Sequence, residues 1–252
     1  MVNLMEDKYP IITGKNPVYE ALRSNRTINK IFIAEAVQKS NIKSILSLAK
    51  EKDVVIQFIP KQKLDKIAHS TNHQGIVAET AAYSYVDLTE IISKSKGKGK
   101  EPFLIMLDGI EDPHNLGSIL RTADVVGVDG VIIPKRRSAS LSATVAKTSA
   151  GAVEYVPVTR VTNLAQTLDQ LKKEGYWIVG TDASAKEYFT EIDYSLPICL
   201  IIGSEGKGIS KLIKEKCDFF VSMPMKGHIN SLNASVAAAI IMYEVYRQRD
   251  FK

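Results

Sequence analysis

The sequence is poor in cysteine, in aromatic residues and in long apolar runs. Its two cysteines, Cys199 and Cys217, lie in or beside apolar stretches and form no C-x-x-C pair. We interpret both as reduced core residues, which is typical of a cytoplasmic protein. No apolar run approaches the roughly 20 residues that a membrane-spanning helix needs, so no membrane segment is expected.

The first ten residues also lack the features of a secretory signal. They carry Glu6 and Asp7 and contain no apolar core of roughly 7 to 15 residues. We therefore expect a cytoplasmic protein. The content of 45% hydrophobic and 24% charged residues is that of an ordinary soluble chain. Lysine and arginine outnumber aspartate and glutamate, 33 to 28, which permits a polyanionic partner without requiring one.

A chain of 252 residues favours two domains, because single domains usually run to roughly 100 to 200 residues. Residues 93–100 alternate serine or glycine with lysine and hold no apolar residue, so they read as a flexible linker. Their lysines are equally suited to touching the phosphates of a nucleic acid. We expect the following plan: a tail over 1–9, a first domain over 10–85, a linker over 86–101 and a second domain over 102–252.

Both expected domains combine helices and strands. In the first domain, hydrophobic spacing predicts helices over 17–23, 42–50 and 61–69 and strands over 30–34, 54–59 and 75–79. In the second domain, short apolar runs predict strands over 103–107, 130–133, 176–180 and 198–202, with helical segments between them. This alternation favours an α/β fold whose mostly parallel sheet is covered by helices on both faces.

Ligands of parallel sheets bind just beyond the carboxyl ends of the strands, and three segments near such ends are unusual. The first, 108–117, leads into a helix with an apolar stripe. Asn115 is placed either to cap that helix or to serve a site. Arg121 lies nearly opposite the stripe, so it must face solvent, a partner or a substrate.

The second segment, 203–210, follows the last strand and has three glycines in six positions, beginning with Gly203 and flanking Glu205. Glycines allow the backbone to approach a ligand closely or to adopt positive φ. The order matches neither the dinucleotide-binding G-x-G-x-x-G pattern nor a phosphate-binding loop, so neither mechanism is expected. A plain turn between strand and helix remains the alternative.

The third segment, 223–235, precedes a helix that runs to about residue 247. Ser231 and Asn233 lie just ahead of this helix and are placed to cap it. Four alanines in its first half allow another element to pack closely, either in the core or across a subunit interface.

The three segments together are far more specific than each alone. They read D-x-x-x-D-P-x-N-x-G-x-x-x-R-T-A from Asp108, G-x-E-G-x-G from Gly203 and P-M-x-G-x-x-x-S-L-N from Pro224. This order and spacing resemble the three motifs of the SpoU (TrmH-like) branch of the SPOUT methyltransferases, over residues 103–249. Residues 14–23 and 73–75 also resemble the substrate-binding domain of the bacterial large-subunit ribosomal RNA guanosine 2′-O-methyltransferases, which is similar to a small ribosomal RNA-binding protein.

The resemblance implies transfer of a methyl group from S-adenosylmethionine to the ribose 2′-hydroxyl of a guanosine in large-subunit ribosomal RNA. It also implies a homodimer and a deep C-terminal trefoil knot, a rare exception to unknotted topology. The knot is expected to form the cofactor pocket. Matching the motifs assigns Gly203, Met223 and Leu232 to that pocket, and Thr181 is added because it ends a strand.

The same resemblance assigns the chemistry to Arg121, and it implies a composite site in which this residue can act across the dimer interface. Two roles stay open: a proton-accepting base, or a cation that fixes the adjacent phosphate and lowers the pKa of the hydroxyl. A guanidinium group normally keeps its proton, which makes the first role physically difficult. The remaining motif residues are expected to orient Arg121, the loop or the ribose: Asn115, Glu205, Ser231 and Asn233. No metal is required.

The sequence also contains a short basic segment and a pair of closely spaced histidines. Lys135, Arg136 and Arg137 follow a strand end and form either an RNA contact or an ordinary exposed basic loop. His69 and His73 are four residues apart, but no cysteine or acidic partner lies nearby in the sequence, so a metal site is not expected.

Two competing functions fit the same pattern less well. A tRNA ribose methyltransferase would carry similar motifs, but the extra N-terminal domain favours ribosomal RNA. A catalytically silent RNA-binding or ribosome-assembly protein would have no physical need for the complete set of polar motif residues. A nucleotide-dependent α/β enzyme is disfavoured because no phosphate-binding loop is present.

Overall fold

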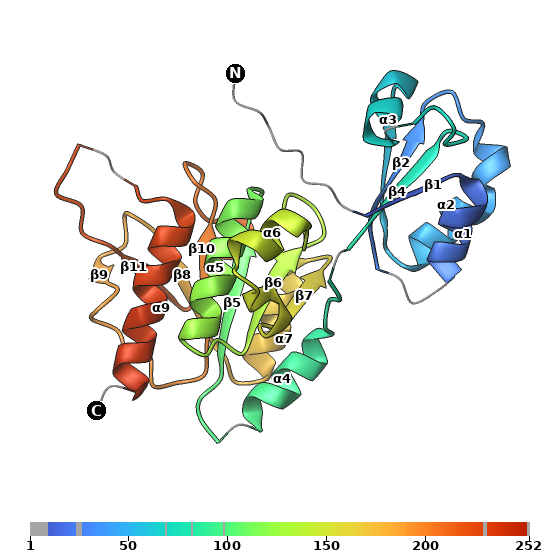
Figure 1. Cartoon of the computed structure of the whole chain (residues 1–252). Helices are drawn as coiled ribbons and strands as arrows, with labels where there is room; N and C mark the ends of the chain where they lie inside the picture. The colour runs from blue at the N-terminus through green and yellow to red at the C-terminus, as the bar shows by residue number, and fades with distance from the viewer. Residues whose placement is uncertain are drawn as a thin grey trace. The chain divides into compact units, whose positions relative to one another are not determined.

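The computed structural model describes residues 10–23, 27–68, 70–81, 83–97, 99–228 and 231–250. They fall into two compact units, each described here by itself (Figure 1). The first unit runs to Ser84 and includes Ser140–Ala143, and the second holds Tyr85–Ala139 and the residues from Thr144 onward. The predicted tail, 1–9, lies outside the described residues.

The first unit is a four-stranded sheet with helices on both faces. The strands lie in the order β1 (Ile11–Thr13), β4 (Ile76–Thr80), β2 (Ile28–Ala34) and β3 (Val55–Ile59). Only β2 and β3 are parallel. The alternating side chains of β2 send Ile31 and Ile33 to one face and Phe32 to the other. The first face packs against α1 (Lys15–Arg23) and α2 (Lys43–Glu51), and the second packs against α3 (Lys61–Ala68). A short 3-10 turn, Lys39–Ile42, precedes α2.

The second unit is built on a seven-stranded sheet in which every pair of neighbouring strands is parallel. Its strands lie side by side in the order β7 (Val158–Val161), β6 (Gly130–Pro134), β5 (Phe103–Asp108), β10 (Ile198–Gly203), β8 (Trp177–Thr181), β11 (Phe219–Ser222) and β9 (Glu187–Tyr188). The predicted α/β class with a parallel sheet is confirmed. The sheet places the carboxyl ends of β5, β10 and β8 next to one another.

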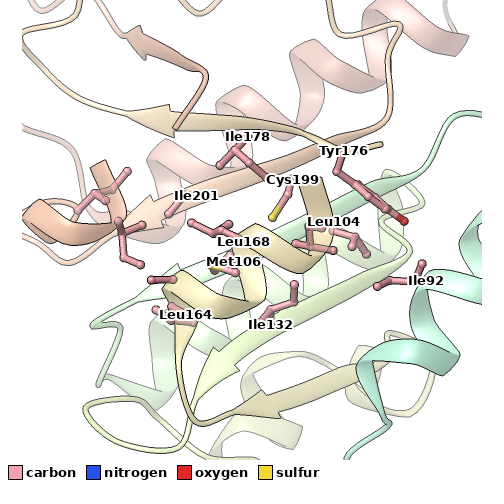
Figure 2. Packing of buried hydrophobic residues seen from close by; sticks show 14 of the residues in the cluster. Ile92, Leu104, Met106, Ile132, Leu164, Leu168, Tyr176, Ile178, Cys199 and Ile201 are labelled. Carbon is pink, nitrogen blue, oxygen red and sulfur yellow. The ribbon is translucent and has the colours of Figure 1, made fainter. Parts of the chain in front are cut away.

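Helices cover both faces of this sheet. On one face lie α4 (Leu88–Lys96), α7 (Leu164–Lys173) and α8 (Lys211–Lys214), packed on a core that includes Met106, Leu168 and Ile201 (Figure 2). On the other face α5 (Pro113–Val125) packs against α9 (Ala234–Asp250) (Figure 1). The remaining helical segments are α6 (Ala143–Thr148) and the 3-10 turn Ala152–Glu154.

The predicted linker over 86–101 is wrong for most of its length, because residues 88–96 form α4. Ile91 and Ile92 are buried in the core of the second unit, and the buried hydroxyl of Ser95 lies 2.7 Å from that of Tyr176. These buried positions repeat at helical spacing, so they form one face. The alternating lysines that suggested a linker lie on the solvent side of that helix or beyond its end.

The two cysteines are free, as predicted. Cys199 is fully buried among the core residues of Figure 2, and Cys217 packs against the same cluster. Burial raises the pKa of both thiols, that of Cys217 to about 12, so neither is a reactive thiolate. Among the described residues no helix combines the length and apolar character that a bilayer crossing requires.

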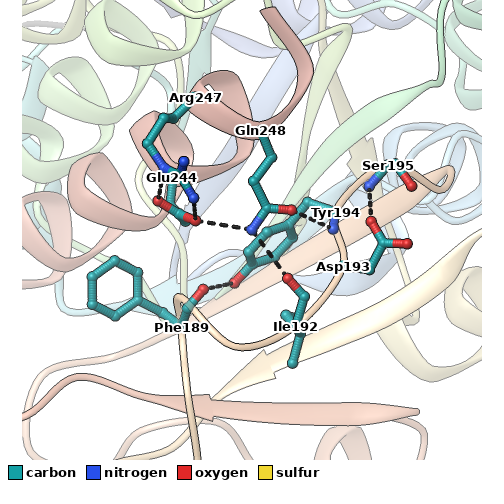
Figure 3. A network of polar contacts seen from close by, with 8 residues as sticks. All are labelled: Phe189, Ile192, Asp193, Tyr194, Ser195, Glu244, Arg247 and Gln248. Atoms are coloured by element: carbon teal, nitrogen blue, oxygen red, sulfur yellow. Dashed lines mark hydrogen bonds and ion pairs between the residues drawn. The ribbon is translucent and has the colours of Figure 1, made fainter. Parts of the chain in front are cut away.

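A polar network fixes the C-terminal half of α9 to the segment ahead of β10 (Figure 3). The side chain of Gln248 accepts from the backbone N–H of Tyr194 (3.0 Å) and donates to the carbonyl of Ile192 (3.1 Å). Tyr194 is fully buried and donates to the carbonyl of Phe189 (2.9 Å). Burial raises the pKa of the Tyr194 hydroxyl, so it stays a donor. These bonds hold the C-terminal half of α9, and the third motif segment directly precedes the N-terminus of the same helix.

Candidate functional site

The loop after β5 leads into α5 through a cap that decides between the two roles left open for Asn115. Asp112, not Asn115, is the N-cap: its carboxylate accepts from the backbone N–H of His114 (2.8 Å), and Pro113 follows at the first helical position. Asn115 lies inside the first turn and is buried. Its amide is therefore free to serve a contact outside the helix.

One carboxylate oxygen joins all three motif segments. Glu205 Oε1 accepts from the side-chain amides of Asn115 (3.2 Å) and Asn233 (2.6 Å) and from the backbone N–H of Ala234 (3.1 Å). The amide of Asn233 also donates to Asn115 Oδ1 (2.9 Å). Residues 90 and 118 positions apart thus share one hydrogen-bonded cluster.

Asn233 has a second role at the start of α9. Its Oδ1 accepts from the backbone N–H groups of Ser235 (3.0 Å) and Val236 (3.3 Å) and from the Ser235 hydroxyl. The predicted capping role is therefore confirmed for Asn233, while its amide nitrogen stays in the cluster. Ser231 instead lines the cavity described below. Capping and site assembly are thus compatible functions of one side chain.

The loop that carries Glu205 is a tight turn closed on itself. Ser204 and Gly208 exchange backbone hydrogen bonds of 3.2 and 2.8 Å, and Gly206 and Gly208 adopt positive φ. At Gly203 a Cβ atom would lie 2.2 Å from the backbone carbon of Gly208, so no other residue fits without opening the turn. The glycines are required by this geometry, not by phosphate binding.

Arg121 is exposed on α5, on the side opposite the buried stripe that includes Leu116 and Leu120, as predicted. Within the part of the chain that the structure describes, its guanidinium forms no hydrogen bond or ion pair. A cation of this kind is available to a substrate or to a partner subunit.

Beside the cluster lies a cavity of about 320 Å³ at the carboxyl ends of β8, β10 and β11. All four residues predicted to bind the cofactor line it, and so do Glu205 and Ser231. Asn115, Arg121 and Asn233 do not. The lining is mostly backbone, aliphatic and thioether groups, and it includes the following residues: Thr181, Ala183, Ile202, Gly203, Met223, Met225, Leu232 and Ala237.

One ion pair in this cavity was not predicted from the sequence. Asp182 and Lys214 both line it and pair with each other. The hydrogen bond from Lys214, with help from Ser184, lowers the pKa of Asp182 to about 2. Asp182 directly follows Thr181 at the end of a strand, which was the available signal. Lys214 was not recognisable, because it lies on a four-residue helix.

The two other features singled out in the sequence have different outcomes. Arg136 and Arg137 are exposed and line a second cavity that also contains Asn115. His73 is buried in the first unit, where Nε2 donates to Asp65 (2.6 Å) and Nδ1 accepts from the N–H of Gly75 (3.0 Å). It therefore fixes the turn before β4. His69 lies outside the described residues.

Comparisons with known proteins agree with this geometry. Residues 102–243 match the model of the SpoU rRNA Methylase family, and residues 11–86 match the model named RNA 2′-O ribose methyltransferase substrate binding. A TrmH family tRNA/rRNA methyltransferase of Bacillus subtilis is 50% identical over 246 residues, 98% of each chain.

Solved structures are similar as well. The SpoU methyltransferase AviRb from Streptomyces viridochromogenes in complex with AdoMet superposes with a TM-score of 0.60 and 25% identity, covering 94% of this chain and 89% of that one. The TrmH/SpoU tRNA modifying enzyme of A. aeolicus is 32% identical, covering 65% of this chain and 85% of its own, with a TM-score of 0.56.

The chain therefore belongs to the SpoU rRNA methylase family. It is an RNA 2′-O-ribose methyltransferase that uses S-adenosylmethionine.

Proposed function

We propose that this enzyme methylates the 2′-hydroxyl of a guanosine in large-subunit ribosomal RNA, in the cytoplasm and as a homodimer. The observation that carries the proposal is the hydrogen-bonded cluster of Asn115, Glu205 and Asn233, which unites the three motif segments next to the 320 Å³ cavity. The match of residues 11–86 to a substrate-binding model supports a separate RNA-binding unit, similar to a small ribosomal protein.

The cavity suits S-adenosylmethionine by its chemistry. Its backbone and aliphatic lining fits a flat heterocycle with polar edges, and the missing side chain at Gly203 lets the turn that lines it close on itself. In the proposal Thr181, Gly203, Met223 and Leu232 hold this cofactor. When bound, it supplies an electrophilic methyl group on a sulfonium.

The protein must then align the ribose oxygen with that carbon. As the bond from the 2′-oxygen to the methyl carbon forms, the bond from that carbon to sulfur breaks and the hydroxyl proton passes to solvent. Alignment of this kind supplies several kcal/mol of the barrier. We assign alignment to the cluster around Glu205 and to Ser231. Arg121 acts as a cation that lowers the pKa of the hydroxyl, because guanidinium groups normally keep their proton.

Two structural features support the homodimer and the knot. Apolar side chains stay exposed on α9 and at the end of α5, at Val236, Ile240, Tyr243 and Val125, which is the kind of surface that subunit contacts cover. In the sheet, β10 lies between β5 and β8 although it follows both in the chain. A late strand inserted between earlier ones is consistent with the proposed trefoil knot.

Mapping 2′-O-methyl positions in ribosomal and transfer RNA from cells lacking this protein tests the proposal. Loss of one guanosine mark in large-subunit ribosomal RNA, restored by the wild-type gene but not by an Arg121→Ala variant, is the expected result. Loss of a tRNA mark instead would reassign the substrate. An unchanged map in both RNAs would contradict the proposed substrate.

A further inference from the structure

A second cavity, of about 550 Å³, adjoins the one assigned to the cofactor. The two share the turn after β10 as a common wall, since both are lined by Ser204, Glu205, Lys207 and Gly208. The second cavity also contains Asn115 of the catalytic cluster. Its volume lies within the usual range of small-ligand sites, roughly 300 to 1,000 Å³. A ligand seated here therefore lies next to the cofactor cavity, at the turn that contributes to both.

The charged groups of this cavity are of two kinds. Arg136 and Arg137 contribute exposed guanidinium groups that form no ion pair or hydrogen bond with any described residue. Arg137 has a φ of 55°, a left-handed conformation that is uncommon for a residue with a side chain. Unpaired arginines favour phosphate groups, which they can bind through two parallel N–H bonds.

Four carboxylates line the same cavity: Asp108, Glu111, Asp112 and Glu205. Three of them are already engaged, because Asp108 accepts from the N–H of Ser210 (2.8 Å), Asp112 caps α5 and Glu205 holds the motif cluster. Glu111 is exposed and forms no hydrogen bond or ion pair within the described part of the chain. It is therefore the carboxylate with both oxygens available to a ligand.

We propose that this cavity binds the nucleotide to be methylated, with Glu111 reading its base as guanine and with Arg136 and Arg137 holding its flanking phosphates. This inference rests on the proposed function and adds the residues that select the base. Because Ser204, Glu205 and Gly208 line both cavities, a nucleotide placed here brings its ribose beside the cofactor cavity.

The chemistry of the bases explains the choice of guanine. An ionised carboxylate can only accept hydrogen bonds, and two adjacent N–H donors satisfy it best. Guanine presents such a pair on its Watson–Crick edge, N1–H and the N2 amino group. The other bases place a lone-pair acceptor beside each donor on that edge, which a carboxylate repels. Reading a splayed-out base on this edge is the usual mode of specific RNA recognition.

The test uses an RNA fragment that carries the mapped target nucleotide either as guanosine or as inosine, which lacks only the N2 amino group. Wild-type enzyme should methylate the inosine RNA with about tenfold lower kcat/KM, the loss expected for one hydrogen bond to a charged group. Glu111→Gln should lower kcat/KM on guanosine RNA by a similar factor and should no longer distinguish the two RNAs. Glu154→Gln, an exposed carboxylate outside both cavities, is the matched control and should behave as wild type.

The role proposed for Arg136 and Arg137 is tested by measuring how the rate of methylation depends on RNA concentration. Arg137→Gly removes the cation at a position whose backbone favours glycine, so it should raise KM for RNA severalfold and weaken the salt dependence of KM, with unchanged cofactor affinity. Lys173→Ala is the control for loss of an exposed cation elsewhere.

The outcomes separate the two proposals. A Glu111→Gln enzyme that still prefers guanosine over inosine as strongly as wild type would overturn the reading of this cavity, while the enzyme's activity on ribosomal guanosine would stand. A wild-type enzyme whose mapped target is not a ribosomal guanosine would overturn the proposed function, and the inference with it.

Discussion

Three hydrogen bonds of the site converge on one oxygen atom of Glu205, which accepts from Asn115, Asn233 and Ala234. Charge-assisted bonds of this kind are stronger than neutral ones and fix the positions of their donors. The carboxylate therefore holds the β10 turn, the first turn of α5 and the start of α9 in one arrangement. We regard it as a positioning residue.

Arg121 has the opposite character, since it is exposed and unpaired among the described residues. Arg121→Ala should lower kcat by about 10²-fold or more, because it removes a charge that acts on the reacting hydroxyl. Cofactor affinity, measured by calorimetry, should stay near wild type, since Arg121 does not line the cofactor cavity. Full methyl transfer by the variant would remove Arg121 from the mechanism.

The ion pair of Asp182 and Lys214 predicts a pH dependence of stability. Because the folded pKa of Asp182 is about 2 against an ordinary 3.8, its contribution is complete above about pH 5, declines as the pH falls through 3.8 and is lost as the pH falls through about 2. Asp182→Asn should therefore lower the free energy of unfolding by about 1 to 2 kcal/mol at pH 7, and the difference from wild type should shrink to a few tenths of a kcal/mol, roughly, near pH 2. Urea unfolding at several pH values measures this. A difference that stays constant down to pH 2 would contradict the assignment.

Individual residue roles were only partly predictable from the sequence. The exposure of Arg121 followed from helical spacing, and the cap at Asn233 followed from its place before a helix. Of the two roles left open for Asn115, capping is excluded because the helix begins earlier, at Pro113, and Asp112 supplies the cap. The amide bonds to Glu205 were beyond prediction, since they join residues about ninety or more positions apart.

Among the elements, α4 is a core helix that the sequence pattern did not predict, because its lysines are typical of a linker. Ile91→Ala, at a side chain only 1% exposed, should destabilise the protein by about 2 to 5 kcal/mol through the cavity it leaves. Denaturant unfolding measures the change. Ser93→Ala, on the exposed side of the same helix, is the control and should have almost no effect. Equal stability of the two variants would restore the interpretation as a linker.

The strands that the sequence missed are short or polar. β7 reads Val-Thr-Arg-Val, and β9 has only two residues. β11, Phe219–Ser222, follows a cysteine and an aspartate that obscure its start. In the seven-stranded sheet the strands predicted correctly, β6, β5, β10 and β8, are the central ones, whose buried faces make them continuous apolar runs. The outer strands of this sheet carry a weaker pattern because they are shorter and less buried.

For the whole molecule, the two-unit organisation was predictable from length, whereas the order of strands in the sheet was not. Periodicity defines elements but cannot show that β10 enters between β5 and β8. The expectation of a knot and of a dimer came only from the resemblance to known methyltransferases, and both stay proposals.

A shared site in the proposed dimer predicts complementation between inactive subunits. Mixing Arg121→Ala chains with Asn233→Ala chains should restore about a quarter of wild-type activity, because half of the dimers become mixed and each then has one intact site. Methyl transfer after co-refolding of the two variants measures this. No recovery would mean that both residues serve the site from the same chain.

The central claim is that the three motif segments form one site for methylation of a ribose hydroxyl. Its most direct test incubates the purified enzyme and methyl-labelled S-adenosylmethionine with ribosomal RNA from cells that lack the protein, followed by mass spectrometry of the nucleosides. The account predicts labelled 2′-O-methylguanosine as the product, absent with Arg121→Ala. A nucleoside labelled on its base, or an equal yield from the variant, would contradict it.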